Sequence, residues 1–69
     1  MKIQAIAHSY WRKVKRGERT FESLKNVNAA SGYPSMQEQV KYLANTDVQN
    51  GVITEEEYKQ YIGEVYTEE

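Results

Sequence analysis

The sequence predicts an all-α protein, a small bundle of three to four short helices with a C-terminal helical hairpin. Two observations lead to this fold class. Apolar residues recur at helical spacing along most of the chain, and glycines or capping residues mark where each such stretch begins and ends. No segment alternates apolar and polar residues as a strand does. The 69 residues are expected to form one small domain, 1–69, with a single modest core.

The first helix is predicted over residues 3–16. One apolar stripe at helical spacing runs along it, formed by Ile3, Ile6, Ala7, Tyr10 and Val14. Trp11 lies beside this stripe and widens it. Gly17 is the expected end of the helix, because glycine adopts the left-handed conformation that closes a helix.

A second, short helix is predicted over residues 20–26. Thr20 can cap it, and Phe21 and Leu24 are three positions apart, so they share one face. The following stretch, 26–32, contains asparagine, serine and glycine, which indicates a connector.

The third helix is predicted over residues 36–49. Pro34 disfavours a helical conformation in the residue before it, which places the boundary here, and Ser35 with Glu38 has the spacing of a capping box. Its apolar face consists of Met36, Val40, Leu43, Ala44 and Val48. Gly51 ends this helix, and the apolar Val52 is expected to fold back on the last turn.

The fourth helix is predicted over residues 55–62. Thr54 and Glu57 again have the spacing of a capping box, and Gly63 supplies the next helix end. Residues 67–69 are expected to form a frayed tail.

A chain of this size needs its large side chains inside. The predicted core consists of Ile6, Tyr10, Trp11, Val14, Phe21, Leu24, Val40, Leu43, Val48, Ile53, Tyr58 and Ile62. Trp11 is the decisive member, because a domain with so little apolar surface can hardly leave its only tryptophan exposed.

The net charge of −1 hides a partition between two halves of the chain. Residues 1–33 contain seven of the nine Lys and Arg residues against two acids, a net +5. Residues 34–69 contain two lysines against eight acids, a net −6. Either the two halves attract one another, within one copy or between copies, or the basic half binds an anionic partner.

No catalytic, cofactor or metal site is predicted. His8 is the only histidine and has no partner at a helical spacing that would orient it as a base, and the chain has no cysteine for a thiolate metal site. The run 55–57 consists of three glutamates, but it falls in the first turn of a helix, where the dipole and the free amides favour carboxylates. We therefore expect a protein that is not an enzyme.

The candidate interaction surface combines a basic segment with tyrosines. Its members are Arg12, Lys13, Lys15, Arg16, Arg19, Tyr58, Tyr61 and Tyr66. Tyrosine suits both the edge of a core and a protein interface, so the sequence leaves these two roles open. The basic segment 12–19 also has aromatic neighbours, a combination that can grip phosphates and stack on bases. A pI of about 5.8 and an acidic last helix favour a protein partner.

Two stretches resemble a family of very small proteins encoded in tail regions of bacteriophages and prophages, the XkdX-like proteins. The stretch 48–64, VQNGVITEEEYKQYIGE, is similar to that family's pattern G-x-I-T-x-x-x-Y-x-x-x-x-G. The stretches YWRKVKRG at 10–17 and RTFESL at 19–24 are similar to the aromatic, basic and glycine-ended start of related prophage proteins. The glycine, Ile-Thr and acidic-helix pattern also resembles SHOCT domains, which are short C-terminal oligomerisation modules.

The resemblance implies a phage-derived accessory or structural role that works through protein contacts, with no catalytic residues. We expect a non-enzymatic interaction module whose partner is another protein or a second copy of the chain. The alternative is a small nucleic-acid-associated regulator that uses the basic segment 12–19. No apolar run is long enough to span a membrane, so we expect an intracellular protein. The resemblance implies the cytoplasm of a bacterial host cell or association with a virion.

Overall fold

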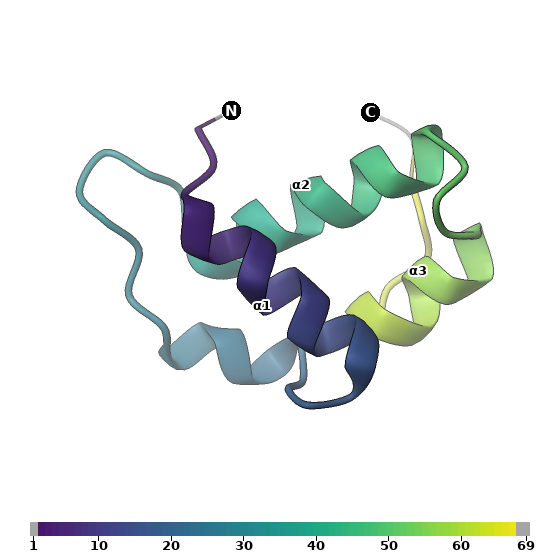
Figure 1. The fold of residues 1–69 in the computed structure, drawn as a ribbon, viewed down its shortest axis with the longest axis horizontal. Coiled ribbons are helices and arrows are strands. Elements are labelled where there is room, and N and C mark those ends of the chain that lie inside the picture. Colours follow the sequence, from purple (N-terminus) through teal and green to yellow (C-terminus); the bar gives the residue numbers. More distant parts are fainter. Residues whose placement is uncertain (1, 68–69) are drawn as a thin grey trace.

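A computed structural model describes residues 2–67 of the chain (Figure 1). Its elements are α1 (Ala5–Arg16), the 3₁₀ helix η1 (Glu22–Asn26), α2 (Met36–Gln49) and α3 (Glu55–Ile62). No strand occurs among these described residues, and the helices form a small bundle. The predicted all-α class is therefore confirmed. Of the tail predicted at 67–69, residues 68–69 lie outside the described residues.

Helix α1 begins two residues later than predicted and ends where predicted. Gln4 precedes it in an extended conformation and makes no capping hydrogen bond with its side chain. At the other end Gly17 has a φ of 77°, and the amides of Gly17 and Glu18 donate to the carbonyls of Val14 and Lys13. These two bonds form a Schellman motif, which satisfies carbonyl groups that the helix leaves open.

The second helix is a single 3₁₀ segment rather than an α-helix. Thr20 does cap the turn, because its hydroxyl oxygen accepts a hydrogen bond of 3.2 Å from the Ser23 amide. Side chains three positions apart eclipse in a 3₁₀ helix, so Phe21 and Leu24 lie one above the other. Leu24 is buried and Phe21 is half-buried against the core.

The caps of α2 and α3 differ in completeness. The Thr54 hydroxyl accepts from the Glu57 amide, and the Glu57 carboxylate accepts from the Thr54 amide, which completes the predicted capping box. Ser35 accepts from the Glu38 amide, but no return bond from the Glu38 side chain forms, so the predicted second box is only half present. A single side-chain bond already satisfies one amide of the first turn, which is enough to start α2.

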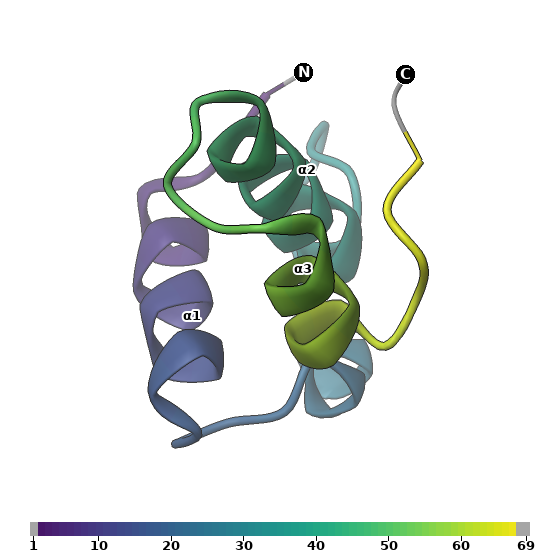
Figure 2. The same ribbon diagram turned by 90° about the vertical axis from the view of Figure 1, so that its right-hand side faces the viewer.

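Two long-range hydrogen bonds show how α1 lies on α2. The Gln4 amide donates to the Gln39 side chain, and the Trp11 indole donates to the Asp47 carboxylate. The paired residues are 35 and 36 positions apart, so the two helices run in the same general direction along their contact. After the turn at 50–54, α3 packs back against α2 (Figure 1). Figure 2 shows the C-terminal tail running beside α2 and α3, on the side away from α1.

The core lies between these helices. Its buried apolar members are Ala7, Trp11, Val14, Leu24, Met36, Val40, Ala44, Ile53, Tyr58 and Ile62. The predicted Tyr10, Phe21, Leu43 and Val48 pack against this cluster but stay partly exposed. Ile6 is wrong as a core residue, because 49% of it is exposed.

Ile6 is exposed because of the orientation of α1 on the core. The buried face of α1 is centred on Ala7, Trp11 and Val14, which turns Ile6 toward solvent. The stripe expected from the sequence is centred one residue away, since a 3.6-residue period does not by itself fix the middle of a broad apolar face. Val52 is likewise 62% exposed rather than folded back, and Ile53 fills the space at the end of α2 instead.

Candidate interaction surface

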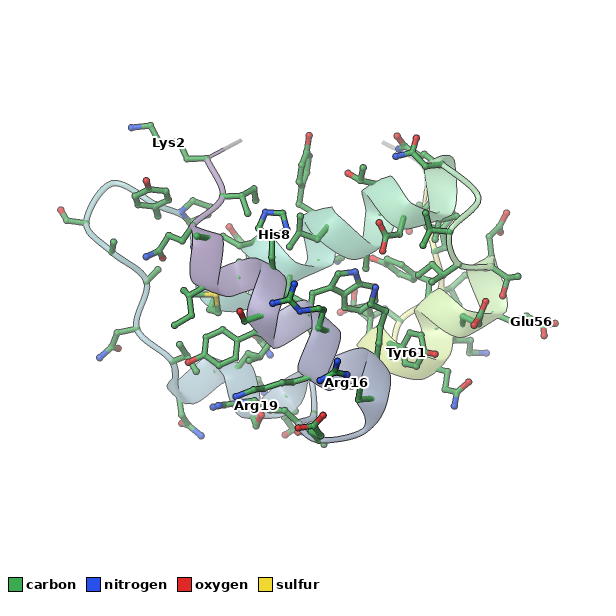
Figure 3. All side chains as sticks on the ribbon, in the orientation of Figure 1. Lys2, His8, Arg16, Arg19, Glu56 and Tyr61 are labelled. Carbon is green, nitrogen blue, oxygen red and sulfur yellow. The ribbon has the colours of Figure 1, made fainter. Side chains whose placement is uncertain are left out.

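The five cations predicted at 12–19 lie around the C-terminal end of α1. We call this set the basic surface; its members are Arg12, Lys13, Lys15, Arg16 and Arg19. Arg12, Lys13 and Arg16 are exposed, because they occupy the side of α1 opposite the buried stripe. Figure 3 shows Arg16 and Arg19 at this end of the molecule.

Two cations of the basic surface, Lys15 and Arg19, are half-buried and make intramolecular contacts. The Lys15 ammonium lies 3.5 Å from the Asp47 carboxylate and 5.0 Å from the centre of the Trp11 ring. The Arg19 guanidinium lies 4.8 Å from the centre of the Tyr10 ring, and its Nε donates to the Ser23 hydroxyl at 3.1 Å. Both side chains therefore cover aromatic rings as well as carrying charge.

The three exposed cations are much less constrained. Arg16 pairs at 3.5 Å with Glu18, a contact in which both side chains are mostly exposed, so its contribution to stability is small. Arg12 donates to the Ser9 hydroxyl at 3.3 Å. Lys13 makes no ion pair within residues 2–67. These three groups are available to a partner.

Two open hollows flank the Gly17–Thr20 loop beside these cations. One, of about 510 Å³, is lined by Lys13, Gly17, Glu18, Arg19, Thr20 and Ser23. The other, of about 450 Å³, is lined by Val14, Lys15, Arg16, Gly17, Arg19, Thr20, Phe21, Gln60 and Tyr61. The lining of the second hollow includes the half-buried rings of Phe21 and Tyr61 and the cations Lys15, Arg16 and Arg19. Shallow, open depressions therefore lie beside the cationic end of α1.

The aromatic neighbours of the basic surface are turned inward. Trp11 is only 4% exposed, and its ring meets the ring of Tyr61 edge to face at 5.8 Å. One face of Tyr10 is covered by Arg19, and Phe21 packs against the core. A base-stacking platform needs an aromatic face that is open to solvent. Trp11 offers none, and Tyr10 and Phe21 are partly covered by Arg19 and by the core.

The structure settles the role of Tyr58 and leaves Tyr61 and Tyr66 at the edge of the core. Tyr58 is 1% exposed and belongs to the core, so its predicted place on an interaction surface is wrong. Tyr66 packs edge to face against Tyr58 at 5.3 Å, and Tyr61 contacts Trp11. Tyr61 and Tyr66 stay partly exposed at the rim of the core. Their main contacts are intramolecular, which fits an apolar ring with one wet edge.

The three glutamates in the first turn of α3 differ in their surroundings. Glu57 belongs to the capping box of α3, while Glu55 and Glu56 are exposed in the same turn.

Within the part of the chain that the structure describes, no three His, Asp or Glu side chains come together in a way that could hold a metal ion. His8 is exposed on α1 (Figure 3).

Sequence reasoning missed the residues that join α1 to the rest of the fold. Gln39 is fully buried; its oxygen accepts from the Gln4 amide at 2.7 Å, and its nitrogen donates to the Pro34 carbonyl at 2.8 Å and to the Gln4 side chain at 3.2 Å. The Gln4 side chain in turn accepts from the Ala30 amide at 3.1 Å. One signal in the sequence could have indicated this role. Gln39 falls at a core position of the apolar repeat in residues 36–49, and a buried side-chain amide needs hydrogen-bond partners.

Across residues 2–67, none of the helices has the length and apolar character needed to cross a membrane. Comparison of the chain with protein-family models, with curated proteins and with solved structures finds no match.

Proposed function

We propose that this chain is a non-enzymatic protein-interaction or structural accessory module of phage or prophage origin, and that it binds acidic protein surfaces through its basic surface. One observation carries the proposal: the exposed cations Arg12, Lys13 and Arg16 share one side of α1, while the neighbouring Trp11 is buried and Tyr10, Phe21 and Tyr61 are partly buried against the core. Charge without an exposed stacking platform suits carboxylates better than bases.

The contacts of the other chemically interesting side chains support a role without catalysis. Asp47 accepts from the Trp11 indole, Glu57 caps α3, and Gln39 ties the start of α1 to α2. Each of these groups is used to hold helices in place. Under this proposal the chain acts in the cytoplasm of a bacterial host or as part of a virion.

An NMR titration tests the choice of partner. The ¹⁵N-labelled chain is titrated at low ionic strength with a ten-residue glutamate-rich peptide, and separately with single-stranded and double-stranded oligonucleotides. We expect the peptide to shift the amide signals of residues 12–19, with an affinity that falls as salt is added. An oligonucleotide that binds ten times more tightly than the peptide would establish the alternative, a nucleic-acid-associated regulator.

A matched pair of variants controls for net charge. Arg12→Gln/Lys13→Gln/Arg16→Gln removes three cations from the basic surface, and Lys2→Gln/Lys25→Gln/Lys59→Gln removes three from elsewhere. The first variant is expected to lose peptide binding, while the second retains it. Equal losses in both would mean that only overall charge matters, and the proposed surface would be wrong.

The phage origin has a separate test, because it rests on the resemblance alone. Tail-fibre, holin or endolysin genes are expected beside the gene that encodes this chain. A location among unrelated chromosomal genes in several genomes would count against that part of the proposal.

A further inference from the structure

We infer that the basic surface of one copy binds the acidic first turn of α3 in a second copy, so that the chain associates head to tail. This inference rests on the proposed function and names its partner. The surface on one side is formed by Arg12, Lys13 and Arg16, and the surface on the other side by Glu55 and Glu56.

Folding leaves the charge partition largely unneutralised. Among the described residues, one ion pair joins the basic half of the chain to the acidic half, Lys15 with Asp47. The other three ion pairs each lie within one half, and they are Arg16–Glu18, Lys25–Glu22 and Lys41–Glu64. With this pair set aside, the described residues retain a net +4 in the basic half and −3 in the acidic half.

The cationic surface of α1 and the acidic first turn of α3 do not meet within one copy. Arg16 and Arg19 lie at the C-terminal end of α1, whereas Glu56 projects from the outer edge of α3 (Figure 3). No ion pair joins the basic surface to Glu55 or Glu56 within residues 2–67. Two complementary surfaces on different sides of one molecule make a heterologous contact, which leaves one surface of each kind free and lets further copies add.

The spacing of the cations on α1 and the position of the acidic turn also favour this contact. Arg12 and Arg16 are one helical turn apart, about 6 Å along α1, and Lys13 lies between them. Glu55 and Glu56 stand on the first turn of a helix that protrudes at the edge of the fold. Shallow, open depressions beside the Gly17–Thr20 loop, lined in part by Lys13, Arg16 and Arg19, offer this protruding turn a surface with three cations.

Sedimentation velocity of the full chain between about 10 µM and 1 mM tests the inference. In about 20 mM salt the average mass is expected to rise with concentration, and about 300 mM salt is expected to return it to that of a monomer, because exposed charges are then screened. Arg12→Gln/Arg16→Gln and Glu55→Gln/Glu56→Gln should each weaken association at least fivefold, the loss expected from two exposed ion pairs. The control Lys25→Gln/Glu38→Gln removes one cation and one acid outside both surfaces and should associate like the wild type.

Mixing the two neutralised variants gives the sharpest readout. Each retains one intact surface, so an equimolar mixture should form a 1:1 complex that grows no further. Circular dichroism and thermal unfolding check that both variants fold, and the single change Glu56→Gln replaces the acidic double variant if its helix content falls. A wild-type chain that is monomeric throughout, or a mixture that stays monomeric, would overturn the inference.

The outcome is distinguishable from a failure of the proposed function. If the wild-type chain stays monomeric but binds the glutamate-rich peptide at residues 12–19, the second copy is the wrong partner while the basic surface remains a protein-binding site. If neither association nor peptide binding occurs, both proposals are wrong. Association that survives high salt would replace charge pairing with an apolar contact and so contradict the inference.

Discussion

Removal of the Asp47 carboxylate is expected to weaken the contact between α1 and α2 more than any other change to an ion-paired side chain. This carboxylate accepts a hydrogen bond of 2.8 Å from the indole of Trp11 and lies 3.5 Å from the Lys15 ammonium. Trp11 is 4% exposed, so water has little access to replace the lost acceptor. In Asp47→Ala, the buried indole N–H therefore loses its hydrogen-bond partner.

The size of the effect follows from three contributions. A hydrogen bond to a charged acceptor contributes about 1.5–3 kcal/mol, and the partly exposed Lys15 pair adds about 0.5 kcal/mol at most. Alanine favours the helix and removes an acid from the last turn of α2, which together return about 1 kcal/mol. The net loss in the free energy of unfolding is about 1–2.5 kcal/mol, which lowers Tm by about 5–15 °C in a domain of this size.

A double-mutant cycle isolates the hydrogen bond from these other contributions. Urea unfolding is followed by circular dichroism for the wild type, Asp47→Ala, Trp11→Phe and the double variant. Since Trp11→Phe removes the donor and keeps an aromatic ring, we expect a coupling energy of about 1–2 kcal/mol. Asp47→Asn keeps an acceptor oxygen and should lose about half as much as Asp47→Ala. A coupling energy below about 0.3 kcal/mol would refute the role given to this contact.

Three further changes test the helix ends and the buried amide, each by urea unfolding. Gly51 has a φ of 74°, and a β-carbon added there would meet no atom within 4 Å. Gly51→Ala should therefore lower the free energy of unfolding by about 1 kcal/mol through backbone strain alone, and a loss above about 3 kcal/mol would indicate a packing defect instead. Thr54→Ala should cost about 1 kcal/mol while Thr54→Ser costs almost nothing, since serine keeps the capping oxygen; equal losses would contradict the cap. Gln39→Leu strands the Gln4 amide and the Pro34 carbonyl and should cost about 2–4 kcal/mol; a neutral effect would show that these groups find other partners.

The helix ends were predictable because their signals are local. Gly17, Gly51 and Gly63 all have positive φ values, and Thr54 with Glu57 forms the complete box that its spacing indicates. Each of these features depends on residues within one or two turns of the chain. A single sequence therefore contains the information needed to place them.

The long-range contacts were not predictable for the opposite reason. Gln4 meets Gln39, and Trp11 meets Asp47, only after the connector 17–35 has brought α2 alongside α1 in the same direction. The hydrophobic period of a helix says which residues share a face, but not which partner that face will meet. The exposure of Arg12, Lys13 and Arg16 was predictable, because long charged side chains stay solvated in most settings, whereas the half-buried positions of Lys15 and Arg19 and the roles of the tyrosines depend on the packing around them.

The proposed preference for an acidic protein partner is consistent with how little core material the chain has. With one Trp and one Phe in 69 residues, folding places Trp11 in the interior and packs Phe21 against the core, and it uses Tyr58, Tyr61 and Tyr66 to complete the same cluster. Because these rings contribute to the core, the proposed function relies on charge at the basic surface. Interactions of that kind are individually weak and sensitive to salt. Under the proposal, useful affinity requires several contacts at once, and repeated copies of the same pair of surfaces would supply them.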